Sequence, residues 1–218
     1  MRTAVLFSGG KDSGLSALLL EPFFDEIELV TFSFGHDDAW KVAAGAAAAL
    51  GHPHRRMVFD EGVLNIALDS LLATGYPNDA LDYAHSVAVE TLAHEYEFVA
   101  DGTRRDDRSP KMDWSAIRSL EDRLHVNYLR PLAGLGGRAI RAMVAQYLIY
   151  EELPSDRYPA SDFEVGLRYA LAERNGENEV ERIFPANHKH TRVIRRKRFV
   201  QEVERQEDPA RQGIQSES

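Results

Sequence analysis

Six residues near the amino terminus, Ser8-Gly9-Gly10-Lys11-Asp12-Ser13, have the types and the spacing to bind a phosphate. They join an apolar run that predicts a strand, Thr3–Ser8, to one that predicts a helix, Ser13–Leu20. Glycines let backbone N–H groups turn inward without a Cβ clash, and the first N–H groups of a helix have no internal acceptor. The helix dipole adds positive potential there, and the two serine hydroxyls can donate as well. The segment is therefore predicted to hold a phosphate or a pyrophosphate.

Three other glycine-rich turns are excluded by the spacing. The lysine comes too early for a Walker P-loop, and Gly9, Gly10 and Gly14 do not form the G-x-G-x-x-G of a dinucleotide site. A serine nucleophile elbow, G-x-S-x-G, needs a glycine where Lys11 stands. Ser13 is accordingly expected to donate to a phosphate rather than to attack a substrate.

The pattern S-G-G-x-D-S resembles the signature of the PP-loop ATP pyrophosphatases, also called N-type ATP pyrophosphatases. This superfamily includes asparagine synthetase, the ligase domain of GMP synthetase, NAD synthetases and several tRNA-modifying enzymes. The resemblance implies ATP and Mg²⁺ as cofactors, with the pyrophosphate on Ser8, Gly9, Gly10, Lys11, Asp12 and Ser13. An acceptor oxygen then attacks the α-phosphorus, pyrophosphate leaves, and a second nucleophile displaces AMP. Such chemistry depends on positioning and charge neutralisation, which makes Lys11 and Asp12 candidate catalytic residues.

A second polar loop, Asp101–Asp107, follows the fourth expected strand. It resembles the G-T-x-x-D-D loop of the same superfamily, whose usual strand order, 3-2-1-4-5, implies that Gly102 and Thr103 lie opposite the glycine-rich turn. Asp106 and Asp107 are candidate catalytic residues, and Asp12 and Asp107 are candidate Mg²⁺ ligands. The alternative is a charged loop exposed to solvent.

The end of the second expected strand is the candidate adenosine site, because the superfamily places adenine against this edge. Phe32 or Phe34 would pack on the base, and Ser33 or His36 would face the ribose. An ordinary strand-to-helix loop is the alternative.

Two further segments are weaker candidates for the cleft. Arg130 lies in an R-P-L stretch that resembles the one after the fifth strand in several superfamily members, and it would contact a phosphate or pair with a surface carboxylate. Tyr83, His85 and Ser86 either face the cleft or are structural, and for a lone histidine on a helix the structural role is the more common one.

A carboxy-terminal segment adds positive charge. Lys189, His190 and Arg192 are predicted to reach the polyphosphate or the acceptor from a lid. A metal on His188 and His190 is disfavoured, because no cysteine or nearby acidic pair completes a ligand set. The basic run Arg195–Arg198 would either attract RNA or form a solvated face.

Strand and helix patterns alternate along the chain, which predicts a mostly parallel sheet with helices on both faces. The resemblance makes this a five-stranded adenine nucleotide alpha hydrolase-like fold. We expect an ATP-binding domain over 1–153, an extension or lid over 154–198, and a charged, partly disordered tail over 199–218. Within them, strands are expected at Thr3–Ser8, Ile27–Phe34, His54–Phe59, Glu97–Asp101 and Val126–Leu129, and helices at Ser13–Leu20, Asp38–Leu50, Gly62–Thr74, Ala80–Tyr96, Asp113–Leu124, Arg138–Glu152 and Asp162–Arg174.

Composition restricts the class of protein. The 218 residues include no cysteine, so disulfides and thiolate metal sites are excluded, and a net charge of −9 does not favour bulk nucleic-acid binding. No apolar run is long enough to span a membrane, and no signal peptide is recognised, so a cytoplasmic protein without membrane contact is expected.

Three functions remain open from the sequence. The first is an AMP-forming, asparagine synthetase-like ligase that joins a nitrogen nucleophile to a small molecule, with ammonia free or from a separate protein. The second is a tRNA-modifying enzyme that uses the same adenylation and an external sulfur or amine donor. The third is a non-enzymatic nucleotide sensor. A homodimer is a further hypothesis.

Overall fold

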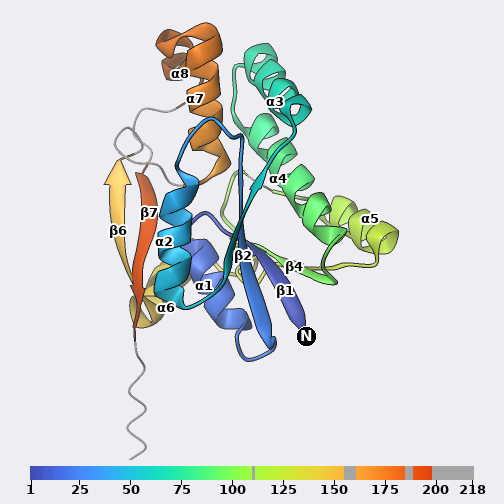
Figure 1. Cartoon of the computed structure of the whole chain (residues 1–218), viewed down its shortest axis with the longest axis vertical. Helices are drawn as coiled ribbons and strands as arrows, with labels where there is room; N and C mark the ends of the chain where they lie inside the picture. The colour runs from blue at the N-terminus through green and yellow to red at the C-terminus, as the bar shows by residue number, and fades with distance from the viewer. Residues whose placement is uncertain (110, 155–160, 185–188, 198–218) are drawn as a thin grey trace, which may run out of the picture.

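A computed structural model describes residues 1–109, 111–154, 161–184 and 189–197. Its main sheet has five parallel strands in the order β3-β2-β1-β4-β5 (Figure 1). This confirms the expected adenine nucleotide alpha hydrolase-like topology. The five strands are β1 (Arg2–Leu6), β2 (Glu26–Ser33), β3 (His54–Val58), β4 (Phe98–Ala100) and β5 (Asn127–Leu129).

Helices cover both faces of the sheet and bury two apolar layers against it. The side chains of α1, α2 and α6 form one layer, and those of α3, α4, α5, α7 and α8 form the other. The helices are α1 (Lys11–Leu20), α2 (Trp40–Leu50), α3 (Glu61–Thr74), α4 (Asn78–Ala93), α5 (Trp114–Leu124), α6 (Gly137–Tyr147), α7 (Phe163–Asn175) and α8 (Glu177–Ile183).

Local sequence explains where several helices begin and end. The alanine-rich α2 stops at Gly51, whose positive φ lets its N–H bond back to Ala47 and Ala48. Asp113 caps α5 by accepting from the N–H of Ala116, and Asp162 caps α7 by accepting from that of Val165. Each cap supplies an acceptor for a first-turn N–H that would otherwise lack one.

Strand β1 lies in the middle of the sheet, between β2 and β4. Its residues Ala4 and Val5 are fully buried and pair in parallel with Val99 and Ala100 of β4. Because both strands run in the same direction, the loops after them meet at one edge of the sheet. The first and fourth loops are thereby brought opposite each other.

The prediction of a helix over Arg138–Glu152 was wrong at its carboxyl end. Helix α6 stops at Tyr147, and β6 (Leu148–Pro154) follows at once. Ile140, Val144 and Leu148 are all buried at helical spacing, which explains why the pattern continues past the true end. Beyond it, antiparallel pairing with β7 (Lys189–Arg196) determines the conformation.

The second sheet joins distant parts of the chain. β7 pairs with β6 and also lies beside α1 and α2, at the left of Figure 1. Helix α8 was not predicted; Gly176, with φ 88°, separates it from α7. The division into a domain over 1–153 and an extension over 154–198 stays a prediction, and the tail predicted over 199–218 lies outside the described residues.

None of the helices in the described part of the chain combines the length and the hydropathy needed to cross a lipid bilayer.

Candidate active site

The glycine-rich turn leads directly into α1. Gly9 has φ 80°, a conformation that favours glycine, and a Cβ there would lie 3.0 Å from the Cα of Ala43. The N–H groups of Asp12 and Ser13, in the first turn of α1, find no acceptor among the described residues. The turn therefore presents the free amides and the helix amino terminus that bind anions.

Segments far away in the sequence fix the turn. Val193 of β7 donates its N–H to the carbonyl of Gly9 over 2.9 Å, and the N–H of Lys11 bonds to Oγ1 of Thr191 over 3.1 Å. The N–H of Ser161 donates to the carbonyl of Ser8 over 3.2 Å. The backbone of the turn is thus held by β7 and by the residue just before α7.

Gly102 brings the fourth loop against the same turn. A Cβ on Gly102 would lie 2.6 Å from the backbone nitrogen of Ser13 and 2.8 Å from the carbonyl carbon of Asp12. Only glycine permits this close approach. The predicted meeting of Gly102 with the glycine-rich turn is therefore present in the structure.

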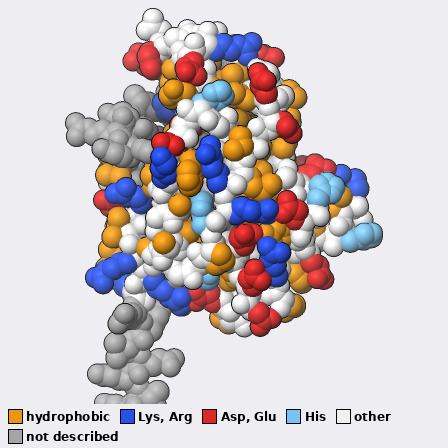
Figure 2. Space-filling view, in the orientation of Figure 1, with side chains coloured by type: hydrophobic (Ala, Val, Ile, Leu, Met, Phe, Trp, Pro, Cys, Tyr) orange, Lys and Arg blue, Asp and Glu red, His pale blue; other side chains and the backbone are white. Residues whose placement is uncertain are grey.

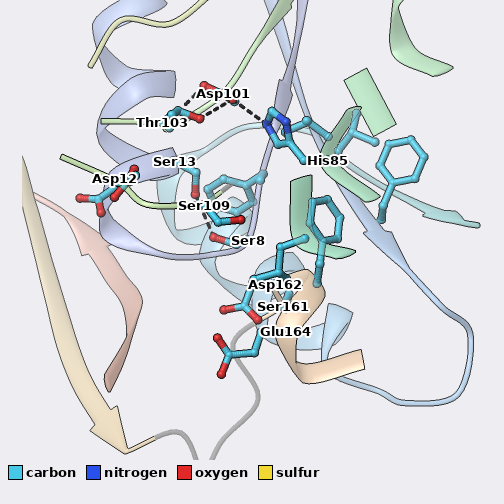
Figure 3. Close-up of a pocket in the computed structure, with 18 residues that line it drawn as sticks. Ser8, Asp12, Ser13, His85, Asp101, Thr103, Ser109, Ser161, Asp162 and Glu164 are labelled. Carbon is cyan, nitrogen blue, oxygen red and sulfur yellow. Dashed lines mark hydrogen bonds and ion pairs between the residues drawn. The ribbon is translucent and has the colours of Figure 1, made fainter. Parts of the chain in front are cut away.

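A cavity of about 230 Å³ lies between the turn, the fourth loop, α4 and the start of α7. Figure 3 shows Ser8 and Ser13 between Asp101, Thr103 and His85 on one side and Ser161, Asp162 and Glu164 on the other. The lining residues are Leu6, Phe7, Ser8, Asp12, Ser13, Val30, Phe32, Leu81, His85, Asp101, Gly102, Thr103, Asp107, Ser109, Ser161, Asp162, Phe163 and Glu164.

The lining is apolar in one part and polar in another. Leu6, Val30, Phe32, Leu81 and Phe163 supply apolar surface, whereas the turn supplies hydroxyls, free amides and a carboxylate. A flat aromatic base joined to a polyphosphate requires this combination of surfaces. The cavity therefore combines an apolar wall with a polar end that can bind an anion.

Asp12 has one engaged and one free carboxylate oxygen. Its Oδ2 lies 3.0 Å from Nζ of Lys11 and 3.6 Å from Nε of Arg104. Its Oδ1 is buried and has no hydrogen-bond partner among the described residues. A buried acceptor without a partner is costly, so this oxygen is suited to bind a cation or a donor on a ligand.

The donor set for Mg²⁺ is smaller than expected. Both oxygens of Asp107 accept hydrogen bonds from Arg104, and the described residues contain no cluster of three or more acidic or histidine side chains that could hold a metal. Mg²⁺ is commonly held by one or two carboxylates together with substrate phosphates. Asp12 fits that arrangement, whereas Asp107 is already engaged by Arg104.

A buried polar network supports the fourth loop from below. Asp101 accepts hydrogen bonds from His85 Nε2 over 2.7 Å, from the N–H and the hydroxyl of Thr103, and from the hydroxyl of Tyr128. Burial alone would raise the pKa of Asp101, but the hydrogen bond and charge of His85 hold it below its usual value. Burial beside this carboxylate raises the pKa of Tyr128 well above its usual value. The carboxylate is therefore ionised, and it fixes the position of His85 at the cavity wall.

The start of α7 forms the opposite wall with a second buried histidine. Oδ2 of Asp162 lies 2.8 Å from Nδ1 of His190 on β7. Burial opposes the charge of His190, but its hydrogen bond and ion pair with Asp162 raise its pKa above the usual value. His190 therefore connects β7 to α7 behind the cavity wall.

The structure places several candidate residues outside the cavity lining. Phe34 packs on Phe59 in the core with ring centroids 5.0 Å apart, and Ser33 accepts from Nε of Arg56. His36 is exposed on the loop before α2. The lining does include Phe32, so one of the four predicted adenosine contacts faces the cavity.

Other candidates lie on neighbouring loops rather than in the lining. Asp106 is exposed and accepts from the N–H of Gly137 at the start of α6 over 2.9 Å. The guanidinium of Arg130 stacks 4.7 Å from the ring centroid of Trp114 and donates to the carbonyl of Met112. Gly9, Gly10 and Lys11 shape the turn through their backbone. The functional roles predicted for all of these residues stay predictions.

Two of the four lysine and arginine side chains of β7 are paired with carboxylates. Arg192 pairs with Glu151, and Arg196 makes a bidentate pair with Glu21 at 2.6 Å for each bond. Lys189 and Arg195 are exposed. Basic side chains gather at the lower left of Figure 2, near the end of β7. His188 and Arg198 lie outside the described residues.

Sequence reasoning missed much of the cavity wall. Asp101 was included in the second polar loop, but no role of its own was predicted for it. Ser161, Asp162 and Glu164 had no local signal for a site, because their neighbours in space lie far away in the chain. Ser161, for example, accepts from the N–H of Ala43, which is 118 positions away. Only the helix predicted over Asp162–Arg174 covered part of this wall.

The model of a family of unknown function, DUF7411, matches residues 1–195, which include every element that lines the cavity. The chain belongs to DUF7411.

Two matches from Methanocaldococcus jannaschii, one to a protein sequence and one to a crystal structure, cover most of this DUF7411 chain. An uncharacterized protein is 42% identical over 194 residues, which cover 89% of this chain and 96% of that protein. A crystal structure described as the predicted subunit of a tRNA methyltransferase has a TM-score of 0.83 and 40% identity, and the match covers 91% of this chain and 98% of that one.

A third protein is more distant. The U34-tRNA thiolase NcsA of Methanococcus maripaludis has a TM-score of 0.45 and 14% identity, with 83% of this chain and 69% of that chain covered. A likeness this weak supports no conclusion about shared fold or function.

Proposed function

We propose that this protein uses ATP to adenylate a nucleotide of tRNA and releases pyrophosphate. The observation that carries the proposal is the buried, unpartnered Oδ1 of Asp12 beside the free amides of α1, at the polar part of a cavity with an apolar wall. This arrangement suits a nucleoside triphosphate with an associated cation. The PP-loop signature supports the same substrate.

In the proposed reaction, an oxygen of the acceptor base attacks the α-phosphorus of ATP. The bond from that phosphorus to the bridging oxygen breaks, and the leaving pyrophosphate is stabilised by the amides of Asp12 and Ser13. A separate nucleophile then displaces AMP from the base. Mg²⁺, bound through Asp12 and the phosphates, would supply charge neutralisation at the leaving group.

A tRNA acceptor is supported better than the amide-forming ligation of a small molecule. The relative at 40% identity is described as the predicted subunit of a tRNA methyltransferase, which links a protein of this fold and length to tRNA. No relative reported above is described as an amide ligase. A separate sulfur or nitrogen donor protein and a homodimer remain part of the proposal.

The test is Mg²⁺-dependent release of pyrophosphate from ATP in the presence of unmodified tRNA. Asp12→Asn should lower the rate at least a hundredfold, because it removes the free carboxylate oxygen's charge at the turn. The matched control is Asp69→Asn, an exposed carboxylate that pairs with Arg174 on the surface and should leave the rate unchanged. Wild-type turnover in Asp12→Asn would rule out the assignment, and ATP binding without turnover would indicate a sensor.

A further inference from the structure

An exposed tryptophan lies beside unpaired basic residues at the same sheet edge as the cavity. Trp114, at the start of α5, is 74% exposed, the largest value among the exposed large hydrophobic side chains of the described residues. Arg130, at the end of β5, holds its guanidinium 4.7 Å from the centroid of that ring. Trp114 and Arg118 line one shallow hollow on α5.

The charge of this region is opposite to that of the chain as a whole. Residues 104–141 contain nine lysines and arginines but only five acidic residues, in a chain whose net charge is −9. Arg104 and Arg123 are paired with carboxylates. Six of the others form no ion pair with a described residue: Arg105, Arg108, Lys111, Arg118, Arg138 and Arg141.

These residues are connected to the cavity through the loops that carry them. The loop after β4 contributes Asp107 and Ser109 to the cavity lining and then leads to Trp114. The N–H of Arg105 bonds to the carbonyl of Leu135 over 3.1 Å, which joins this loop to the one after β5. Trp114 follows Ser109 by five positions, so their Cα atoms lie within about 18 Å of each other.

We infer that the loops after β4 and β5, together with the start of α5, form a surface that binds single-stranded RNA next to the cavity, with one base stacked on Trp114. The inference rests on the proposed function and identifies where its tRNA acceptor docks. Exposed aromatic rings and arginines bind single strands by stacking, and unpaired cations attract the phosphates. The excess of unpaired positive charge favours RNA over a protein partner.

This surface differs from the basic run of β7. Figure 1 shows α5 at the right of the molecule and β7 at the left. On β7, Arg192 and Arg196 are already paired with carboxylates, whereas Arg118 on α5 makes no described pair. Variants in α5 and variants in β7 therefore test the two candidate docking surfaces independently.

Tryptophan fluorescence tests the inference directly. The chain has two tryptophans, Trp40 and Trp114, so Trp40→Phe leaves Trp114 as the sole reporter in the full-length protein. Unmodified tRNA should quench the emission of Trp114, and the apparent affinity should fall as salt rises. Trp114→Ala and Arg118→Glu, followed by filter binding, should each weaken tRNA binding about tenfold, whereas Trp114→Phe should retain most of it.

The control is Arg195→Glu on β7, which should bind tRNA like the wild type. The inference is overturned if Arg195→Glu is the variant that loses tRNA binding. It is also overturned if the fluorescence of Trp114 changes only with protein concentration, as expected when a second copy of the protein covers Trp114. It is also overturned if Trp114→Ala and Arg118→Glu both keep wild-type tRNA affinity and wild-type tRNA-dependent release of pyrophosphate. If Asp12→Asn is inactive in the same experiment, the proposed function stays intact. Conversely, weakened tRNA binding in these variants without any pyrophosphate release in the wild type supports the surface and rejects the adenylation.

Discussion

His85 Nε2 lies 2.7 Å from Oδ2 of Asp101, and both side chains are almost completely buried beneath the loop that faces the glycine-rich turn. The pair connects α4 to the end of β4. Asp101 accepts from Thr103 as well, so the conformation of the fourth loop depends on the same carboxylate. This buried pair therefore helps to determine how the fourth loop meets α1.

His85→Gln should destabilise the protein by about 3 kcal/mol near neutral pH, because the buried carboxylate of Asp101 loses its hydrogen bond with His85. In the wild type, the lowered pKa of Asp101 contributes stability above about pH 4 that is lost as the pH falls through the folded-state pKa. Without His85, burial raises that pKa instead, so the variant loses stability as the pH rises. Urea unfolding from pH 3 to pH 7 should show a gap between variant and wild type that widens with pH.

Tyr128→Phe is the matched control for that experiment. It removes one donor to Asp101 but keeps His85, so it should cost about 1.5 kcal/mol and retain the wild-type dependence on pH. A gap between His85→Gln and wild type that is constant across the pH range would show that the two side chains do not form an ion pair.

Gly102→Ala should disrupt the contact between the fourth loop and α1. The new Cβ would lie 2.6 Å from the nitrogen of Ser13, and the backbone there has no side-chain atoms that could rotate away. We expect a loss of about 2 kcal/mol in stability, together with at least a tenfold weaker affinity for ATP in calorimetric titration. Gly45→Ala, in α2 with open space around its Cβ, should instead stabilise by about 0.5–1 kcal/mol and bind ATP normally. Equal ATP affinity in both variants would contradict the close approach.

His190→Gln should change how stability depends on pH above neutrality. The raised pKa of His190 means that its ion pair with Asp162 contributes stability below about pH 6.5, and that this contribution is lost as the pH rises through the folded-state value. Glu164 also favours the charged ring, and Arg168 opposes it. Melting temperatures from pH 5.5 to pH 8.5 should therefore decline in the wild type and vary less in the variant. The exposed His94→Gln should follow the wild type; if it flattens the profile equally, the effect does not belong to the pair.

The sequence was sufficient for the sheet and for the turn at its centre, because each depends on local pattern. Alternating strand and helix signals predicted a parallel sheet. The strand order implied by the resemblance predicted that the first and fourth loops lie opposite each other, and Gly102 against Ser13 bears this out. Among the site residues predicted from the sequence, Ser8, Asp12, Ser13, Phe32 and Thr103 line one cavity in the structure.

What the sequence could not supply are contacts between segments that are distant in the chain. The i, i+4 spacing of Val144 and Leu148 continues across the boundary between α6 and β6, since only the partner strand determines where the helix ends. The wall contributed by Ser161 and Asp162 depends on α2 and β7, which no local pattern identifies. The pairing of Arg192 and Arg196 with carboxylates could not be predicted from the sequence either. More of the basic side chains of β7 were therefore expected to be free to bind a ligand than the structure shows.

The bond from Val193 to Gly9 has a consequence for how the protein is made. A ribosome synthesises the glycine-rich turn among the first residues, but the strand that fixes its backbone emerges some 180 positions later. The turn can therefore take its final backbone conformation only after β7 has been synthesised and has packed against it. It is completed late in folding although it is synthesised early relative to β7.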